Sequence, residues 1–197
     1  VGYTLDPQYG WSCWESGPFT CAFKGREATV CEAMNQLTVL GEPDHASITT
    51  ILRPLKGHFA FILQGPDWTL AVTDKARAYP IFYTESGSTP NLSNSARLLQ
   101  NDSGLDQPDA GAALEFAAAG YVTGRATLYK GLYQLQAGEY LLWRKGSDAL
   151  SRESYYDFFA TAFRDEGQEA LIHELDQATD AIFSRLMEDA AGRPVFV

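Results

Sequence analysis

Two apolar segments near the middle of the chain, GHFAFILQ and WTLAVTD, constrain the fold more than any other feature. A Gly-Pro-Asp sequence at residues 65–67 separates them, and this composition is typical of a turn between two strands. In the first segment Phe59 and Phe61 alternate with Ala60 and Ile62, so both faces carry apolar side chains. The segment therefore predicts a strand that is buried on both faces.

The rest of the chain up to about residue 155 is rich in predicted strands. Aromatic runs on both sides of Ser16-Gly17-Pro18 predict a hairpin. The segments YPIFYTES and TPNLSNS predict a second pair, and TLYKGLYQLQAGEYLLWRKG predicts two further strands. Helices are grouped and do not alternate with the strands. This order indicates an α+β fold, with either two sheets or one sheet with the helices outside.

Three shorter segments have the signals of helices. TVCEAMNQLTVLG places Thr29 and Glu32 at capping-box spacing, so we expect a helix that begins at Thr29. HASITTILRPL predicts a shorter helix that ends at Pro54. PDAGAALEFAAAGY predicts a helix with Asp109 as its N-cap and Gly120 just after its end.

The pattern changes near residues 155–165, where we expect a domain boundary. Beyond it, apolar residues recur at helical spacing and predict one stripe on a helix of about six turns; they are Leu171, Leu175, Ala178, Ile182 and Leu186. Gly192 is expected to end this helix, and Val195–Val197 to form a strand. We therefore divide the chain into residues 1–157 and residues 158–197, the latter resembling the start of a parallel α/β unit.

Composition excludes several classes of function. The formal net charge of −10 argues against nucleic acid and anionic membranes as partners. No apolar run approaches the roughly 20 residues of a membrane span, and the first residues do not form a signal peptide. The cysteines, Cys13, Cys21 and Cys31, lack the spacing of a metal site and are interpreted as reduced thiols of a cytoplasmic protein.

Direct signals of chemistry are absent from the sequence. We find no glycine-rich phosphate loop, paired-cysteine zinc motif or nucleophile elbow. For His45, His58 and His173 capping or surface roles are favoured over catalysis. The segment Lys24-Gly25-Arg26 could bind an anion, although a turn is the better interpretation. The sequence thus predicts no catalytic, cofactor-binding or metal-binding residue in this chain.

A longer stretch resembles the glutaminase-type domain of the asparagine synthetase family. The segment LKGHFAF is similar to the family pattern Leu-Asp-Gly-x-Phe-Ala-Phe. Residues 73–83, TDKARAYPIFY, are similar to Arg-Asp-Arg-x-Gly-x-Lys-Pro-Leu-Tyr-Tyr, with Arg77 in place of the glycine. SNSARLLQ, GYVTGRATLYKGLYQLQAGEYLLW and YYDF resemble later family segments in the family's order. The resemblance covers about residues 50–197.

This resemblance implies the αββα sandwich of N-terminal-nucleophile hydrolases, made of two antiparallel sheets, followed by the first helix and strand of an ATP-dependent synthetase domain. In the family, a strand similar to RPVFV leads into a Ser-Gly-Gly-x-Asp-Ser loop that holds the pyrophosphate of ATP. ATP and Mg²⁺ are therefore expected cofactors of a longer enzyme, and this chain alone is expected to bind neither. The rest of the synthetase domain is the expected partner, with a peptide substrate or a partner protein in addition. The alternative is a small protein that ends in a terminal strand.

The chain departs from the family at the residues that hydrolyse glutamine. The family uses an N-terminal cysteine, an Arg-Gly-Pro-Asp loop and an Asn-Gly-Glu segment. Position 1 here is Val, Cys13 lies inside an aromatic strand, and FKGREAT keeps only Gly25 of the Asn-Gly-Glu segment. The resemblance therefore implies a glutaminase domain that has kept its fold and lost its activity.

An asparagine synthetase relative without glutaminase activity needs an amine from a source other than glutamine to form its amide bond. Members that form β-lactams or lasso-peptide macrolactams resemble this pattern, because an amine of the substrate attacks its own adenylated carboxylate. A macrolactam-forming lasso-peptide cyclase is the preferred interpretation. The alternatives are an ammonia-dependent asparagine synthetase, a sugar-amidating relative, and a non-catalytic module that binds a substrate or a partner.

The loss of glutaminase activity can be tested directly with the cysteines. We expect the purified chain to release no glutamate from glutamine above the buffer background, before and after Cys13, Cys21 and Cys31 are replaced together by Ser. Glutamate is measured with a coupled dehydrogenase assay, and circular dichroism checks that both proteins are folded. Robust release that disappears in the triple variant would show that one of these thiols is a nucleophile.

Overall fold

The computed structural model describes residues 2–85, 89–147, 150–159 and 163–194. The chain divides into two compact units, Val1–Asp157 and Phe158–Val197. The first unit holds ten strands and four α-helices among its described residues, and the second holds one long helix. The assignment of the second unit to a synthetase domain stays a prediction.

The larger sheet of the first unit has six strands, and every neighbouring pair is antiparallel. Its centre is the predicted hairpin, in which Phe61 pairs with Val72 and Ile62 with Ala71. The strands, in spatial order, are β10 (Ser151–Ser154), β9 (Glu139–Arg144), β5 (Trp68–Thr73), β4 (Phe59–Gln64), β3 (Phe19–Gly25) and β2 (Ser12–Ser16).

The smaller sheet has four short strands in the order β1 (Gly2–Thr4), β7 (Asn91–Ser93), β6 (Phe82–Thr84) and β8 (Leu132–Gln134). Its last three strands pair antiparallel, as the sequence predicts. The expectation of purely antiparallel sheets is wrong at one place, because β1 pairs parallel with β7 and places Tyr3 beside Leu92. A short 3₁₀ helix, Pro7–Tyr9, connects β1 to β2.

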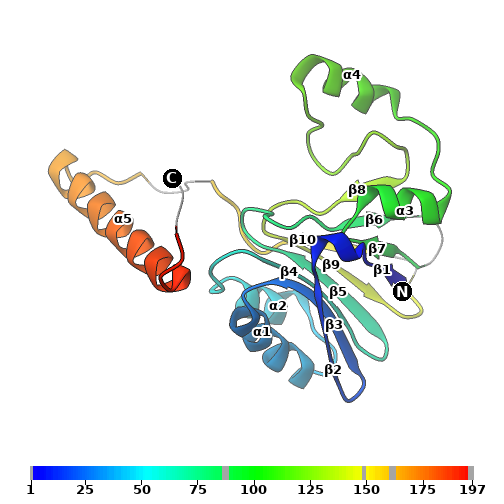
Figure 1. Ribbon diagram of the computed structural model, residues 1–197, viewed down its shortest axis with the longest axis horizontal. Helices are drawn as coiled ribbons and strands as arrows, with labels where there is room; N and C mark the ends of the chain where they lie inside the picture. The colour runs from blue at the N-terminus through cyan, green and yellow to red at the C-terminus, as the bar shows by residue number, and fades with distance from the viewer. Residues whose placement is uncertain (1, 86–88, 148–149, 160–162, 195–197) are drawn as a thin grey trace. The chain divides into compact units, whose positions relative to one another are not determined.

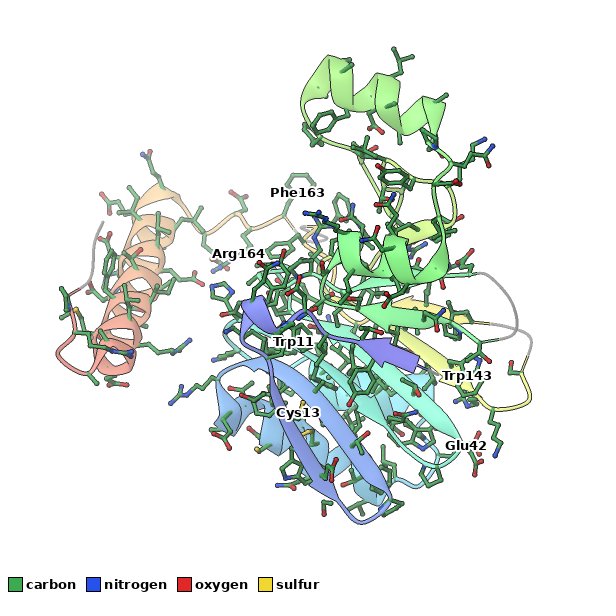
Figure 2. All side chains as sticks on the ribbon, turned by 45° about the vertical axis from the view of Figure 1, so that its right-hand side comes forward. Trp11, Cys13, Glu42, Trp143, Phe163 and Arg164 are labelled. Atoms are coloured by element: carbon green, nitrogen blue, oxygen red, sulfur yellow. The ribbon has the colours of Figure 1, made fainter. Side chains whose placement is uncertain are left out.

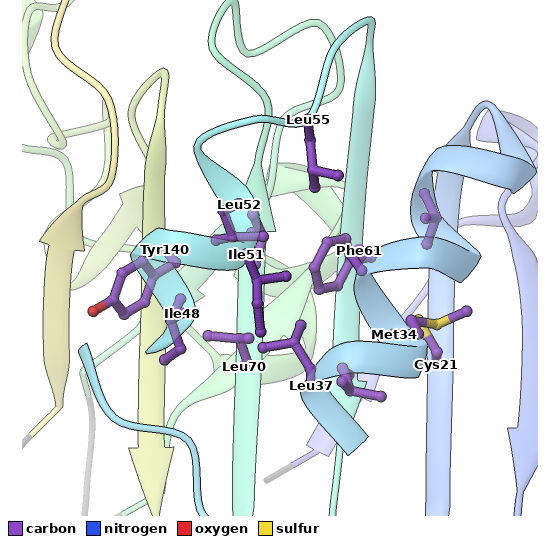
Figure 3. Packing of buried hydrophobic residues seen from close by; sticks show 14 of the residues in the cluster. Cys21, Met34, Leu37, Ile48, Ile51, Leu52, Leu55, Phe61, Leu70 and Tyr140 are labelled. Carbon is purple, nitrogen blue, oxygen red and sulfur yellow. The ribbon is translucent and has the colours of Figure 1, made fainter. Parts of the chain in front are cut away.

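Two helices, α1 (Glu27–Val39) and α2 (His45–Leu52), cover one face of the larger sheet. Figure 3 shows their apolar side chains above the strands, with Met34 and Leu37 from α1 and Ile48 from α2 near Phe61 and Leu70. All five side chains are buried. Since burial of one large apolar side chain contributes about 1.5–3 kcal/mol, this layer is a main source of stability.

The opposite face of the larger sheet packs on the smaller sheet. Small residues, Ala60 and Ala71, face this interior together with Ile62, and they meet Tyr83 and Leu92 of the smaller sheet. On the smaller sheet lies α3 (Ala96–Ser103), which contacts β6, β7 and β8 (Figure 1). The layer order is therefore helix, sheet, sheet, helix, and the expected αββα sandwich is confirmed.

The start of α1 differs from the sequence prediction. The helix begins at Glu27 with Arg26 as its N-cap, and Thr29 is already in its first turn. The physical reason lies at Gly25, where β3 ends with a φ of +117° and where a Cβ atom would lie 2.3 Å from the His58 carbonyl oxygen. Only glycine fits this approach, so the chain turns there and the helix starts at once. The turn predicted at residues 24–26 is wrong for Lys24 and Gly25, which are the last residues of β3, and Arg26 is the N-cap of α1.

The second unit is dominated by α5 (Gln168–Ala190), a helix of 23 residues that matches the predicted one. It ends at Ala191, whose left-handed backbone has a φ of +48°. Large apolar side chains along it remain exposed, for example Leu175 at 65% and Ile182 at 62%. The predicted strand at Val195–Val197 lies outside the described residues. Among the helices that the structure describes, none combines the length and apolarity needed to cross a membrane.

One buried carboxylate connects several of these elements. Asp74, which follows β5, is 1% exposed and accepts hydrogen bonds from three backbone N–H groups: those of Phe59 at 3.1 Å, Ala76 at 2.7 Å and Ala78 at 3.1 Å. Its own carbonyl oxygen accepts from the Gly138 N–H at 2.9 Å. Asp74 therefore fixes the start of β4, the end of β5 and the loop that crosses to the smaller sheet.

We expect Asp74→Asn to lower the free energy of unfolding by about 3 kcal/mol, because an amide NH₂ group must face backbone donors and charge-assisted hydrogen bonds are lost. Urea denaturation followed by circular dichroism measures the change. Asp67→Asn is the matched control, since that side chain is 74% exposed in the β4–β5 turn and should change stability by less than about 0.5 kcal/mol. Equal unfolding midpoints for the two variants would contradict the structural role of Asp74.

Candidate functional site

Two adjoining cavities in the first unit form the candidate site. The first has a volume of about 490 Å³ and the second about 460 Å³. Phe82, Ala96 and Arg97 line both cavities and form the wall between them. These residues come from β6 and the first turn of α3, so the smaller sheet and its helix form the base of the site.

The loop between β5 and β6 supplies one side of both cavities. Arg77 lines the first cavity, and Tyr79 and Pro80 line the second. The Asp74 carboxylate holds the Ala76 and Ala78 backbone N–H groups, which flank Arg77. As a result the same buried carboxylate that organises the sheets also fixes the backbone on both sides of Arg77.

The N-terminal segment closes the second cavity through Tyr9 and Trp11 (Trp11 is labelled in Figure 2). Two hydrogen bonds dock this segment: the Asp6 N–H donates to Asn94 Oδ1 at 2.8 Å, and Asn94 Nδ2 donates to the Asp6 carbonyl at 3.2 Å. Lys24 adds a third, from its ammonium to the Gly10 carbonyl oxygen at 2.9 Å. Asn94, 3% exposed, thus fixes a wall made of residues distant in sequence.

The first cavity is completed by α4 (Ala110–Ala119) and the segment that follows it. Asp109 caps this helix by accepting from the Ala112 N–H at 3.0 Å, and Gly120 ends it with a φ of +81°, both as predicted. Phe116 and Tyr121 line the cavity and are 47% and 61% exposed. This wall therefore presents aromatic surface to any molecule that enters.

The charge of the site is opposite to that of the chain. Among the described residues, no Asp or Glu lines either cavity, whereas Lys24, Arg77 and Arg97 do. Within this part of the chain neither Arg77 nor Arg97 forms an ion pair. Because the chain carries a net charge of −10, a cationic and aromatic hollow is an unusual feature of its surface.

A polar network includes Tyr83 and Arg125, which are the chain neighbours of the lining residues Phe82 and Ala126. Glu139, 4% exposed, accepts from Arg125 Nε at 3.0 Å and from the Gln136 N–H at 2.8 Å. The hydrogen bond with Glu139 raises the pKa of the Arg125 guanidinium. Burial raises the pKa of Tyr83, and a hydrogen bond from Arg152 at 3.2 Å partly opposes that rise. These groups are paired with one another and are interpreted as structural.

The cysteines show no arrangement typical of a nucleophile. Cys13 is exposed on the outer strand β2 (Figure 2), and Cys31 is partly buried. Cys21 is fully buried under α1, where burial raises the pKa of its thiol, and its hydrogen bond goes to the Ala22 carbonyl at 3.8 Å. A raised pKa leaves less thiolate at neutral pH, so Cys21 is a poor nucleophile. Val1 lies outside the described residues.

The histidines also lie outside the cavities. His45 shares a 2.5 Å hydrogen bond with the Tyr140 hydroxyl, and His173 contacts Gln177 on α5. The Nδ1 atom of His58 lies 3.9 Å from the Asp74 carboxylate, and its side chain is 65% exposed. The described residues contain no cluster of His, Cys, Asp and Glu that could hold a metal ion.

Sequence reasoning did not identify Arg77, Arg97 or the aromatic residues around them as a site. It did single out the three segments that supply most of the lining, namely residues 73–83, SNSARLLQ and the segment that starts at Gly120. The available signal was the combination of arginine and aromatic residues in KARAYPIFY and SNSAR. Only the fold shows that these segments lie together and form one site.

Comparison with known proteins adds little to this description. No protein-family model matches the chain, and no curated protein matches it at a significant level. It is similar to a solved glutamine phosphoribosylpyrophosphate amidotransferase from B. subtilis, complexed with ADP and GMP, at 14% identity over 74% of this chain and 31% of that one, with a TM-score of 0.40. A structure described as the allosteric regulatory enzyme of purine biosynthesis gives 14% identity, 74% and 30% coverage, and a TM-score of 0.37. The chain spans less than a third of both chains, and likeness at this level carries no argument about function.

The backbone at Arg77 generates a prediction. Its φ of +53° lies in the left-handed region, at the position where the family pattern has glycine. Because this conformation costs a residue with a Cβ atom about 1–2 kcal/mol, we expect Arg77→Gly to raise the free energy of unfolding by about 1 kcal/mol. Urea denaturation provides the measurement.

Ala78→Gly is the matched control in the same loop, because the φ of Ala78 is not in the left-handed region. There glycine only adds conformational freedom to the unfolded chain and should lower stability by about 0.5–1 kcal/mol. Destabilisation of the same size in both variants would show that the conformation of Arg77 carries no strain.

Proposed function

We propose that this chain is the N-terminal part of an ATP-dependent, amide-bond-forming enzyme similar to asparagine synthetases. In this proposal residues 1–157 form a glutaminase-type domain without glutaminase activity, and residues 158–197 begin the synthetase domain. The substrate is a peptide whose carboxylate is adenylated and then attacked by an amine of the same molecule, as in macrolactam-forming lasso-peptide cyclases.

The exposed apolar stripe of α5 is the observation that carries the proposal. Leu171, Leu175, Ile182 and Leu186 recur at helical spacing, yet they are between 39% and 65% exposed. Each such side chain gains about 1.5–3 kcal/mol when it is buried. A helix with one continuous apolar face is typical of an element that packs in a larger core, and the second unit contains no such core among its described residues. A following α/β domain would supply it.

Two further observations support the loss of glutaminase activity. Cys13, Cys21 and Cys31 lie inside the chain, on β2, β3 and α1, so none of their thiols has a free α-amine beside it to act as the base. Gly25, the residue kept from the family's Asn-Gly-Glu segment, is explained by close packing on the His58 carbonyl. Its presence is therefore accounted for by the fold without a catalytic role.

A second candidate function is a binding module, and the two cavities favour it. They lie within the first unit and are lined by aromatic and cationic residues, and no cysteine is found among the described residues of their lining. A binding role of residues 1–157 is compatible with a synthetase role of the domain that follows. The two candidates therefore need separate tests.

Nucleotide binding tests the synthetase proposal. We expect this chain to bind a non-hydrolysable ATP analogue weakly or not at all in calorimetric titration. A longer chain that continues past Val197 through a Ser-Gly-Gly-x-Asp-Ser loop should bind it at micromolar concentration with Mg²⁺, because that loop supplies the pyrophosphate donors. Replacing the two glycines of that loop by Val should abolish binding and leave folding intact. Micromolar binding by the present chain, or none by the longer one, would overturn the proposal.

A further inference from the structure

We propose that the two adjoining cavities of the first unit form a binding groove for an acidic peptide segment. One apolar or aromatic side chain of the peptide occupies each cavity, and a carboxylate between them pairs with Arg97. This inference is independent of the synthetase proposal, because it rests only on residues 1–157.

The shape of the groove fits a ligand with two apolar groups. Each cavity has a volume near the lower part of the range found for small-molecule sites. The first cavity is lined by Phe116 and Tyr121, the second by Trp11 and Tyr79, and Phe82 separates them. Aromatic residues of this kind bind apolar groups by covering their surface, so each cavity favours one apolar or aromatic side chain of the ligand.

The charge of the groove determines the polar part of the ligand. Arg97 lines both cavities, is exposed, and has no ion pair among the described residues. Arg77 adds a second guanidinium without an ion pair in the first cavity. The Lys24 ammonium in the second cavity is already bonded to a carbonyl oxygen. Since a guanidinium binds a carboxylate through two parallel hydrogen bonds, Arg97 is the residue best placed to recognise an acidic side chain between the cavities.

A carboxylate fits this site better than a nucleotide. A triphosphate needs several backbone N–H donors and, as a rule, carboxylates that hold Mg²⁺. The described lining of the groove provides no carboxylate and no glycine-rich loop between strand and helix. One or two guanidinium groups among aromatic rings instead match a single negative charge flanked by apolar groups.

An extended peptide can present these three groups together. In a strand, side chains at positions i, i+2 and i+4 point to the same side, about 6–7 Å apart. The probe is therefore acetyl-Phe-Gly-Glu-Gly-Phe-amide, in which two aromatic side chains flank one carboxylate. The matched neutral probe carries Gln in place of Glu, so that only the charge differs.

Calorimetric titration measures binding at low salt, and tryptophan fluorescence is a second readout because Trp11, one of the four tryptophans of the chain, lines the second cavity. We expect the acidic probe to bind at submillimolar concentration and at least fivefold more tightly than the neutral probe. Arg97→Gln should remove that preference, so that the acidic and the neutral probe bind this variant equally. Arg53→Gln is the matched control, because Arg53 is exposed and lies outside both cavities. Thermal denaturation checks that each variant is folded.

Three outcomes would overturn the inference. Equal binding of the two probes would show that the groove does not recognise the carboxylate. An Arg97→Gln variant that still prefers the acidic probe would show that another residue binds the carboxylate. Displacement of the acidic probe by a lower concentration of an ATP analogue would identify the groove as a nucleotide site. The first two results leave the synthetase proposal untouched, so they distinguish a failure of this inference from a failure of that proposal. Displacement by the ATP analogue at micromolar concentration would count against both proposals.

Discussion

The carboxylate of Asp74 is the interaction on which the architecture of the first unit depends. Where two sheets stack face to face, a connecting segment leaves the hydrogen-bonded strands of one sheet and enters those of the other. The backbone N–H and C=O groups of this segment are not paired in either sheet, so they need hydrogen-bond partners elsewhere. Asp74 supplies three acceptor contacts to such backbone, and neighbouring groups extend the same junction: Thr73 Oγ1 donates to the Gln136 carbonyl at 2.5 Å, and the Tyr155 hydroxyl donates to the Thr73 carbonyl at 2.7 Å. The loop that carries Arg77 is therefore held in place by the same hydrogen bonds that join the two sheets.

Much of the fold could be predicted from the sequence because its signals are local. The β4–β5 hairpin follows from alternating apolar residues and a turn, and α4 follows from Asp109 and Gly120. The parallel pairing of β1 with β7 and the edge strand β10 could not be predicted, because short strands of three or four residues owe their conformation to distant partners. The start of α1 was misplaced for a similar reason, since the contact of Gly25 with the His58 carbonyl is invisible in the local pattern.

The candidate site was less predictable than the fold. Its residues come from five separate stretches of the chain, and Arg97 looks in the sequence like any solvated arginine at the start of a helix. The resemblance to a family drew attention to these stretches for their place in the sandwich. In the sequence Arg77 was only a departure from the pattern that the chain resembles. Its left-handed backbone and its place in the lining of the first cavity are known from the structure alone. Residues held in such backbone conformations cluster at active sites and ligand-binding sites.

The docking of the N-terminal segment has a consequence for access to the groove. The wall that contains Trp11 is part of the sandwich itself. The strand before it, β1, pairs with β7 of the smaller sheet, and the strand after it, β2, pairs with β3 of the larger sheet. Trp11 also packs against the core between the two sheets, and three hydrogen bonds hold the segment between the strands, two joining Asp6 to Asn94 and one joining Lys24 to Gly10. Detaching this wall would require the loss of strand pairing and of core contacts, which costs more free energy than the opening of an unattached loop. The second cavity is therefore preformed, and a ligand can enter it without a movement of the N-terminal segment.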